Sequence, residues 1–205
     1  MFKLAVFVSG RGSNLLAISS KINEGYLQAE ISAVVSNKSD CKAIEFADTQ
    51  NIPSYIVSDN IESKNVIGYT KLIEILKQKK IDLVILAGFL KKIPVEFIRA
   101  FEKKIINIHP ALLPSFGGKG MYGSHVHRAI FDQSVKVSGP TVHFVDEIYD
   151  NGKIIAQRAI DITDVESPEE IAQRVLKVEH EILPEVIKKF TENKIREVGN
   201  RIFID

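Results

Sequence analysis

The chain is poor in cysteine and in long hydrophobic runs. Its one cysteine, Cys41, cannot form an internal disulfide and has no metal-site spacing. The longest purely apolar run, Leu83 to Leu90, is far too short to span a bilayer. The first eight residues lack the apolar length and the cleavage site of a signal peptide. These absences favour a soluble, cytoplasmic protein in a reducing compartment.

The chain also lacks an excess of charge of either sign. Its 27 Lys and Arg residues nearly balance 26 Asp and Glu residues, which gives a formal net charge of +1. We therefore expect no general attraction to nucleic acid or to an anionic membrane. A length of 205 residues without repeats or low-complexity segments suits one domain that spans residues 1–205.

Short apolar segments alternate with helical patterns along the chain. We expect strands at residues 4–8, 31–35, 54–57, 82–87, 104–109, 137–145 and 153–160. We expect helices at about residues 15–22, 43–47, 66–77, 94–101, 124–131 and 167–190, and a terminal strand pair within residues 194–205. The alternation predicts an α/β fold: a three-layer, Rossmann-like, mostly parallel open sheet with helices on both faces and a C-terminal antiparallel hairpin.

A glycine-rich loop, Ser9-Gly10-Arg11-Gly12-Ser13-Asn14, joins the first strand to the first helix. Glycines let a backbone approach an anion, and the free amides of a first helical turn point towards it. Leu15 stands where a dinucleotide fingerprint has its third glycine, so that interpretation is weak. A plain tight turn is the alternative, and Arg11 favours an anion site.

An amide and an imidazole end the strand at residues 104–109. Side chains two apart on a strand point the same way, so Asn107 and His109 emerge together before Pro110. An amide stabilises a developing oxyanion and an imidazole carries a proton. Alternatively, Asn107 caps the next turn and His109 packs there. Parallel topology predicts that the loops at Ser9, Gly88 and Asn107 share one edge of the sheet.

Two other segments allow two interpretations each, and a pair of histidines does not suit a metal site. The residues Phe89, Leu90 and Ile93 line an apolar slot or merely cover the end of the sheet. The Asp150-Asn151-Gly152 segment reads as a hairpin turn, so Asp150 is as well explained as a turn residue as a catalytic one. The histidines His125 and His127 face different ways on a helix and make a poor metal pair, and we expect no metal.

Several motifs in order resemble a known family. They are residues 9–15 (Ser-Gly-Arg-Gly-Ser-Asn-Leu), 86–89 (Leu-Ala-Gly-Phe), 107–114 (Asn-Ile-His-Pro-Ala-Leu-Leu-Pro) and 141–145 (Thr-Val-His-Phe-Val), followed by Asp150. Together they resemble the phosphoribosylglycinamide formyltransferases of the formyl-folate transferase family, over nearly the whole chain. The resemblance implies transfer of the formyl group of 10-formyltetrahydrofolate to the amino group of glycinamide ribonucleotide in purine synthesis.

The resemblance also implies roles for individual residues. Asn107 and a protonated His109 would stabilise the oxyanion, and Asp150 would orient His109, keep it charged and help the proton transfer. A carboxylate neighbour raises the pKa of a histidine, so we expect His109 to stay charged above about 6.5. The first half, residues 1–100, would mainly bind the ribonucleotide, and residues 101–205 would carry catalysis and folate binding. Ribonucleotide and phosphate contacts are expected from Gly10, Arg11, Gly12, Ser13, Asn14 and Gly88. Folate contacts are expected from Phe89, Leu90, Lys91, Lys92, Ile93, Asn107, Val145, Asp146 and Lys64.

Other functions remain open at this stage. The nearest is another formyl-folate transferase or a 10-formyltetrahydrofolate hydrolase. A nucleotide-binding module or dehydrogenase, or a non-catalytic binding protein, would use the Gly10 loop but give Asn107 and His109 no shared role. We expect small-molecule substrates, no nucleic-acid or membrane partner, and a monomer or homodimer. Two segments depart from the usual family pattern: the Gly117–Gly123 loop is longer, and Asp150-Asn151-Gly152-Lys153 replaces Asp-Gly-Gly-Pro.

Overall fold

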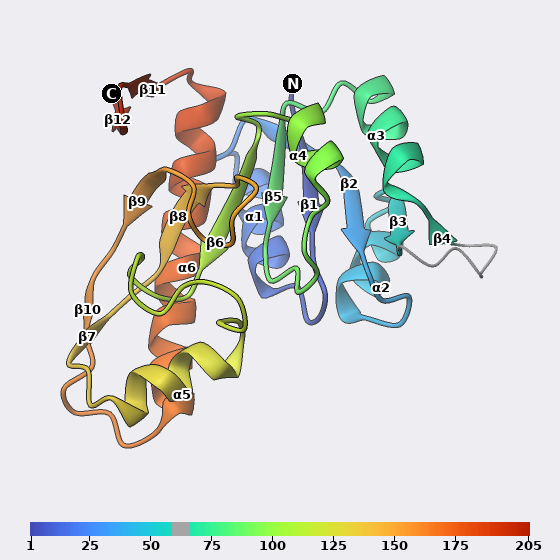
Figure 1. The fold of residues 1–205 in the computed structure, drawn as a ribbon. Coiled ribbons are helices and arrows are strands. Elements are labelled where there is room, and N and C mark those ends of the chain that lie inside the picture. Colours follow the sequence, from blue (N-terminus) through green and yellow to red (C-terminus); the bar gives the residue numbers. More distant parts are fainter. Residues whose placement is uncertain (59–65) are drawn as a thin grey trace. The chain divides into compact units, whose positions relative to one another are not determined.

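The computed structural model describes residues 1–58 and 66–205 (Figure 1). Among these residues the main sheet has eight strands in the order β4-β3-β2-β1-β5-β6-β8-β9. Its strands are β1 Phe2–Phe7, β2 Ala29–Ser36, β3 Ser54–Val57, β4 Val66–Ile67, β5 Leu83–Leu86, β6 Ile105–His109, β8 Thr141–Phe144 and β9 Ile154–Gln157. The helices of the described residues are α1 Ser13–Asn23, α2 Lys42–Thr49, α3 Tyr69–Gln78, α4 Val95–Ala100, α5 Ser124–Asp132 and α6 Pro168–Thr191. The predicted fold class is confirmed.

The chain divides into two compact units, Met1–Ile106 and Asn107–Asp205. The division falls within β6, a few residues after the predicted boundary between the two functional halves. No helix of the described ranges is both long enough and apolar enough to cross a membrane.

The first unit is a parallel sheet whose strands are joined by helices (Figure 1). Strand β1 pairs in parallel with both β2 and β5, and β2 pairs in parallel with β3. The side chains of residues 4–7 are fully buried, as a strand covered on both faces requires. Parallel pairing brings the loops that follow β1 and β5 to the same edge of this unit.

One element boundary in the first unit was predicted wrongly. We expected a helix over residues 66–77, but α3 begins at Tyr69. Val66 and Ile67 instead form β4, which pairs in parallel with Ile56 and Val57 of β3. Their apolar side chains suit either element, and the pairing with β3, which lies outside the segment, decides between them.

The second unit packs α5 and α6 around an apolar cluster. Its fully or almost fully buried members are Ala111, Val126, Ile130, Ile162, Ile171 and Val175. Helix α6 starts as predicted: Ser167 accepts a hydrogen bond from the Glu170 amide, and Pro168 is the first helical residue. The C-terminal pair of strands, β11 Ile195–Val198 and β12 Arg201–Ile204, is antiparallel as predicted.

Two predicted strands of the second unit are each divided in two. The segment 137–145 forms β7 Val137–Ser138 and β8, with Gly139 and Pro140 between them. The segment 153–160 forms β9 and, after a break, β10 Ile160–Asp161. Strands β8 and β9 pair antiparallel, and β7 pairs with β10 in a separate small sheet. Proline lacks the amide hydrogen that a continuous strand needs, which explains the break at Pro140.

Candidate active site

Two loops of the first unit are tied together at the carboxyl ends of β1 and β5. The Ser9 amide donates to the Gly88 carbonyl at 3.0 Å, and the Leu90 amide donates to the Ser9 hydroxyl at 2.8 Å. The predicted meeting of the Ser9 and Gly88 loops is therefore confirmed within this unit.

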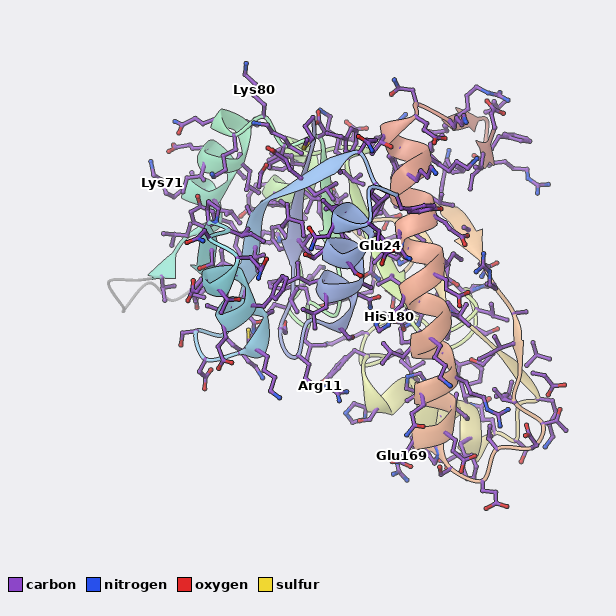
Figure 2. The ribbon with its side chains drawn as sticks, turned by 180° about the vertical axis from the view of Figure 1, so that it is seen from behind. Arg11, Glu24, Lys71, Lys80, Glu169 and His180 are labelled. Atoms are coloured by element: carbon purple, nitrogen blue, oxygen red, sulfur yellow. The ribbon has the colours of Figure 1, made fainter. Side chains whose placement is uncertain are left out.

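The glycine-rich loop leads directly into α1, with Gly12 as the N-cap residue. Gly12 has a φ of +74°, and an added Cβ would lie 3.0 Å from the Ala43 Cβ. Gly12 therefore adopts a left-handed backbone conformation and packs closely against α2, two conditions that favour glycine. The space around Gly10 is open. Arg11 is exposed at this end of the unit (Figure 2). A cation beside the free first-turn amides of a helix favours an anion at that position.

The segment from Phe89 to Ile93 divides between the core and the surface. The Phe89 ring packs edge-on against the buried Phe7 ring, with 5.4 Å between centroids, and Ile93 is itself buried. Leu90, Lys91 and Lys92 are exposed. Phe89 and Ile93 thus help to cover the end of the sheet, and the exposed part of the segment is Leu90 to Lys92.

Strand β6 ends at His109, as the following proline predicted. His109 is buried and Asn107 is half-buried. The Asn107 Nδ2 lies 3.0 Å from the Nε2 of His143 on β8. The His143 Nδ1 lies 2.7 Å from the Phe144 carbonyl, which can only accept, so Nδ1 carries the hydrogen and Nε2 accepts from Asn107. His143 therefore fixes the orientation of the Asn107 amide.

The Asp150 carboxylate lies between two imidazoles. Its Oδ2 is 3.6 Å from the His109 Nδ1, and its Oδ1 is 3.7 Å from the His143 Nε2. Both separations exceed hydrogen-bond length, so the interaction is electrostatic. Asp150 has a φ of +52°, a conformation that Asp tolerates better than most residues. The structure thus brings Asn107, His109 and Asp150 into one cluster within the second unit, and Asp150 is both a turn residue and a member of that cluster.

A backbone segment of the glycine-rich 115–123 loop covers this cluster. The His109 Nε2 donates to the Phe116 carbonyl at 2.8 Å, and the Gly118 amide donates to the Asp150 Oδ2 at 2.9 Å. Because a carbonyl only accepts, Nε2 carries a hydrogen, and the Nδ1 of His109 faces the carboxylate. The Phe116 oxygen therefore occupies a position from which a hydrogen-bond acceptor can receive the His109 Nε2–H.

A buried hydroxyl anchors the loop that follows His109. The Thr141 hydroxyl donates to the Ala111 carbonyl at 2.6 Å and accepts from the Leu113 amide at 3.0 Å. Gln157 on β9 adds to this anchor, because its Nε2 lies 2.9 Å from both the Leu113 carbonyl and the Thr141 hydroxyl. The predicted strand at residues 137–145 includes Thr141 and His143, but the sequence did not predict their partners and gave no signal for Gln157.

The expectation that His109 stays charged above about 6.5 is wrong for this structure. Burial lowers the pKa of His109, and the opposing effects of the Asp150 charge and of the Phe116 carbonyl are smaller. Burial likewise lowers the pKa of His143. Both shifts favour the neutral ring, and the His109 Nε2–H donates to the Phe116 carbonyl.

A third buried histidine, His127 on α5, makes the stability of the protein sensitive to acid. Burial, followed by the charge of His109, lowers the pKa of His127 from 6.5 to about 4. Above pH 6.5 the folded and unfolded chains both hold a neutral ring. As the pH falls towards 4, only the unfolded chain takes up the proton, so stability is lost in this window.

We expect His127→Gln to reduce that loss. The His127 contribution to the free energy of unfolding should fall by about 2 kcal/mol between pH 7 and pH 5 in the wild type, and this part should be absent from the variant. Urea denaturation of both proteins at the two pH values measures the difference. Equal losses in the two proteins would contradict the assignment.

The turn after Asp150 leaves no room for a side chain at Gly152. A Cβ on Gly152 would lie 1.8 Å from the Phe144 carbonyl oxygen, the acceptor that holds His143. We expect Gly152→Ala to lower the free energy of unfolding by about 1–3 kcal/mol, because backbone must move. Gly10→Ala, where nothing lies within 4 Å of the added Cβ, is the matched control and should change it little. Denaturant unfolding of both variants measures the contrast, and equal stability would contradict the close approach.

The remaining predicted folate residues have mixed placements. Asp146 accepts hydrogen bonds from the Ile148 amide at 2.9 Å and from the Asn151 side chain at 3.0 Å, so its carboxylate shapes the loop before Asp150. Val145 is half-buried, and Lys64 lies outside the described residues. In the part of the chain that the structure describes, no group of three or more His, Cys, Asp or Glu side chains could hold a metal ion.

Asn107 and His109 at the end of β6, with the Asp150 carboxylate of a separate loop beside them, supply the amide, imidazole and carboxylate that group-transfer enzymes use. Residues 2–187 match the family model described as formyl transferase, and the chain belongs to this family.

Individual relatives agree with the family assignment. The chain is 44% identical over 195 residues to phosphoribosylglycinamide formyltransferase, chloroplastic, of Arabidopsis thaliana, covering 95% of this chain and 67% of the plant protein. It is 40% identical to phosphoribosylglycinamide formyltransferase of Bacillus subtilis, covering 92% and 94% of the two chains. The crystal structure of glycinamide ribonucleotide transformylase 1 from Symbiobacterium toebii superposes with a TM-score of 0.89 at 33% identity, covering 100% of this chain and 94% of that one.

Proposed function

We propose that this chain transfers the formyl group of 10-formyltetrahydrofolate to the amino group of glycinamide ribonucleotide. The observation that carries the proposal is the cluster of Asn107, His109 and Asp150, with the carboxylate 3.6 Å from the His109 ring. Relatives of 40% and 44% identity that bear the name of this activity support the choice of substrates.

The cluster suits the chemistry of this transfer. The amine nitrogen of the ribonucleotide attacks the formyl carbon, and negative charge develops on the formyl oxygen. Asn107 Nδ2–H and His109 Nε2–H would donate to that oxygen, which replaces the Phe116 carbonyl as the acceptor of His109. The bond from the formyl carbon to the folate nitrogen then breaks, and the proton of the attacking amine passes to the departing nitrogen. Asp150 would carry that proton as a general base and acid.

The first unit would supply the phosphate contacts. Backbone amides at the start of α1, with Ser13, Asn14 and the exposed Arg11, would hold the ribonucleotide phosphate. The predicted Gly10, Gly12 and Gly88 contacts would be made through backbone. Gly10 and Gly88 have open space where a side chain would be, which leaves the backbone approachable.

Folate binding would use backbone groups and side chains of the predicted folate residues. In the first unit these are Leu90, Lys91 and Lys92, together with the half-buried Phe89 and the buried Ile93. In the second unit they are Val145 and the loop that Asp146 shapes. We also propose that the protein acts in the cytoplasm as a monomer or homodimer.

A direct assay tests this function. Formation of the tetrahydrofolate-type product is followed by absorbance with 10-formyltetrahydrofolate, with and without glycinamide ribonucleotide. We expect product only when the ribonucleotide is present. Equal product without it would identify a hydrolase, and no product in either case would overturn the proposal.

A further inference from the structure

A basic hollow lies in the first unit, away from the proposed substrate loops. Its volume is about 380 Å³, and its charged lining consists of Lys77, Lys80, Arg99, Lys104 and Glu102. We name it the basic hollow. The residues come from the end of α3, the end of α4 and the segment just before β6.

The basic hollow lies at the amino ends of the strands. Ile81 in its lining precedes β5, and Lys104 precedes β6 and accepts a hydrogen bond from the Val84 amide at 2.8 Å. Ser9 and Gly88 instead follow the carboxyl ends of β1 and β5. The two ends of β5 are separated by the length of its four residues, about 13 Å. Arg11 and Lys80 accordingly lie at opposite ends of this unit (Figure 2). The basic hollow is therefore separate from the loop proposed for the ribonucleotide phosphate.

Its charge is not explained by the fold alone. Lys77 and Arg99 lie in the last turns of their helices, where cations interact favourably with the helix dipole. Lys80 and Lys104 lie beyond those helices, and Lys80 has a φ of +56° in a position where glycine is usual after a helix. Among the described residues, the side chains of Lys77, Lys80 and Lys104 have no hydrogen-bond or ion-pair partner. The hollow is lined by four cationic side chains against one carboxylate, that of Glu102, so the cations repel one another and a bound anion would relieve that repulsion.

The floor of the basic hollow indicates the rest of the ligand. Ile81 and Phe101 line it and are almost completely buried, and the Phe101 ring packs on the buried Phe97 ring at 4.9 Å between centroids. These two side chains give the lining a small apolar part that packing holds in place. The volume of about 380 Å³ lies within the range of small-molecule sites. A concave site of this size favours a small molecule over a nucleic-acid strand.

We propose that the basic hollow binds a nucleotide that carries two or more phosphates. The phosphates would meet Lys77, Lys80, Arg99 and Lys104, and the nucleoside would lie against Ile81 and Phe101. Binding at this site does not depend on the formyl-transfer assignment, and it is measured without an activity assay.

Calorimetric titration of the whole chain tests the proposal, with ATP, AMP, inorganic pyrophosphate and a single-stranded RNA oligonucleotide as probes. We expect saturable binding of one ATP with a Kd of about 1 mM or tighter. AMP and pyrophosphate should each bind more weakly, and added salt should weaken binding.

Charge-reversal variants locate the site. The double variant Lys80→Glu, Lys104→Glu should weaken ATP binding at least about tenfold. Lys71→Glu is the matched control, because Lys71 is an exposed lysine of α3 that pairs with Glu74 and does not line the basic hollow. It should bind ATP as the wild type does.

Several results would overturn the proposal. They are the absence of saturable ATP binding, equal weakening by Lys71→Glu, or ATP binding that is lost in Arg11→Gln and retained in the double variant. Tighter binding of RNA than of ATP would replace a small-molecule site with a nucleic-acid surface. Pyrophosphate binding as tight as that of ATP would remove the nucleoside from the assignment.

Discussion

Replacing Asn107 with alanine is expected to lower kcat/KM for formyl transfer by about 100- to 1000-fold, the usual cost of one lost oxyanion donor. The same loss is expected for His109→Ala. Each change removes a donor that the proposed mechanism assigns to the oxygen on which charge develops, so kcat should fall more than KM rises. Steady-state kinetics on the purified variants measures both constants.

A matched control separates this effect from general damage. Asn23→Ala replaces an exposed asparagine at the end of α1 and should leave kcat unchanged. The Asn107 variant should also retain its fold, because its amide makes one described hydrogen bond, to His143. Turnover near the wild-type value in either Asn107→Ala or His109→Ala would remove the oxyanion assignment.

The second large effect is expected for Asp150→Asn. Asparagine tolerates the φ of +52° and can still accept the Gly118 amide, so the substitution removes charge and little else. Loss of a general acid–base group typically costs about 100- to 10,000-fold in rate, and we expect kcat to fall within that range.

The same variant changes the titration of His109 in a defined direction. The Asp150 charge raises the pKa of His109 against the larger lowering caused by burial. Removing that charge should lower the pKa of His109 further, which NMR titration of the ring protons would detect. Asp132→Asn, an exposed change at the end of α5, is the control for both measurements. A fully active Asp150→Asn protein, or an unchanged His109 titration, would contradict the role of the carboxylate.

Local patterns were sufficient for much of the fold. The apolar run at residues 4–8 and the proline after His109 are local signals, and β1 and the end of β6 lie where these signals predicted. The predicted start of the helix at residues 66–77 was wrong, because Val66 and Ile67 pair with β3 and form β4 instead. No periodicity within a segment reports a partner strand elsewhere in the chain.

The sequence singled out three residues that the structure brings together, but it did not predict their electrostatics. Motif order singled out Asn107, His109 and Asp150, which lie together. The predicted direction of the His109 pKa shift was wrong, because the shift depends mainly on burial and His109 is only 3% exposed. The orienting contact from His143 and the anchor from Gln157 depend on residues far apart in the sequence, so no spacing rule could supply them.

The cover over His109 and Asp150 is made of main chain, through the Phe116 oxygen and the Gly118 nitrogen. Peptide groups are the same whatever amino acid carries them, so exchanging Phe116 for another residue leaves the oxygen in the chain. Such an exchange would instead disturb the apolar cluster of α5 and α6, against which Phe116 packs. The contact between this loop and the His109 imidazole is therefore insensitive to side-chain replacement. Only a change in the backbone path of the loop can expose the ring.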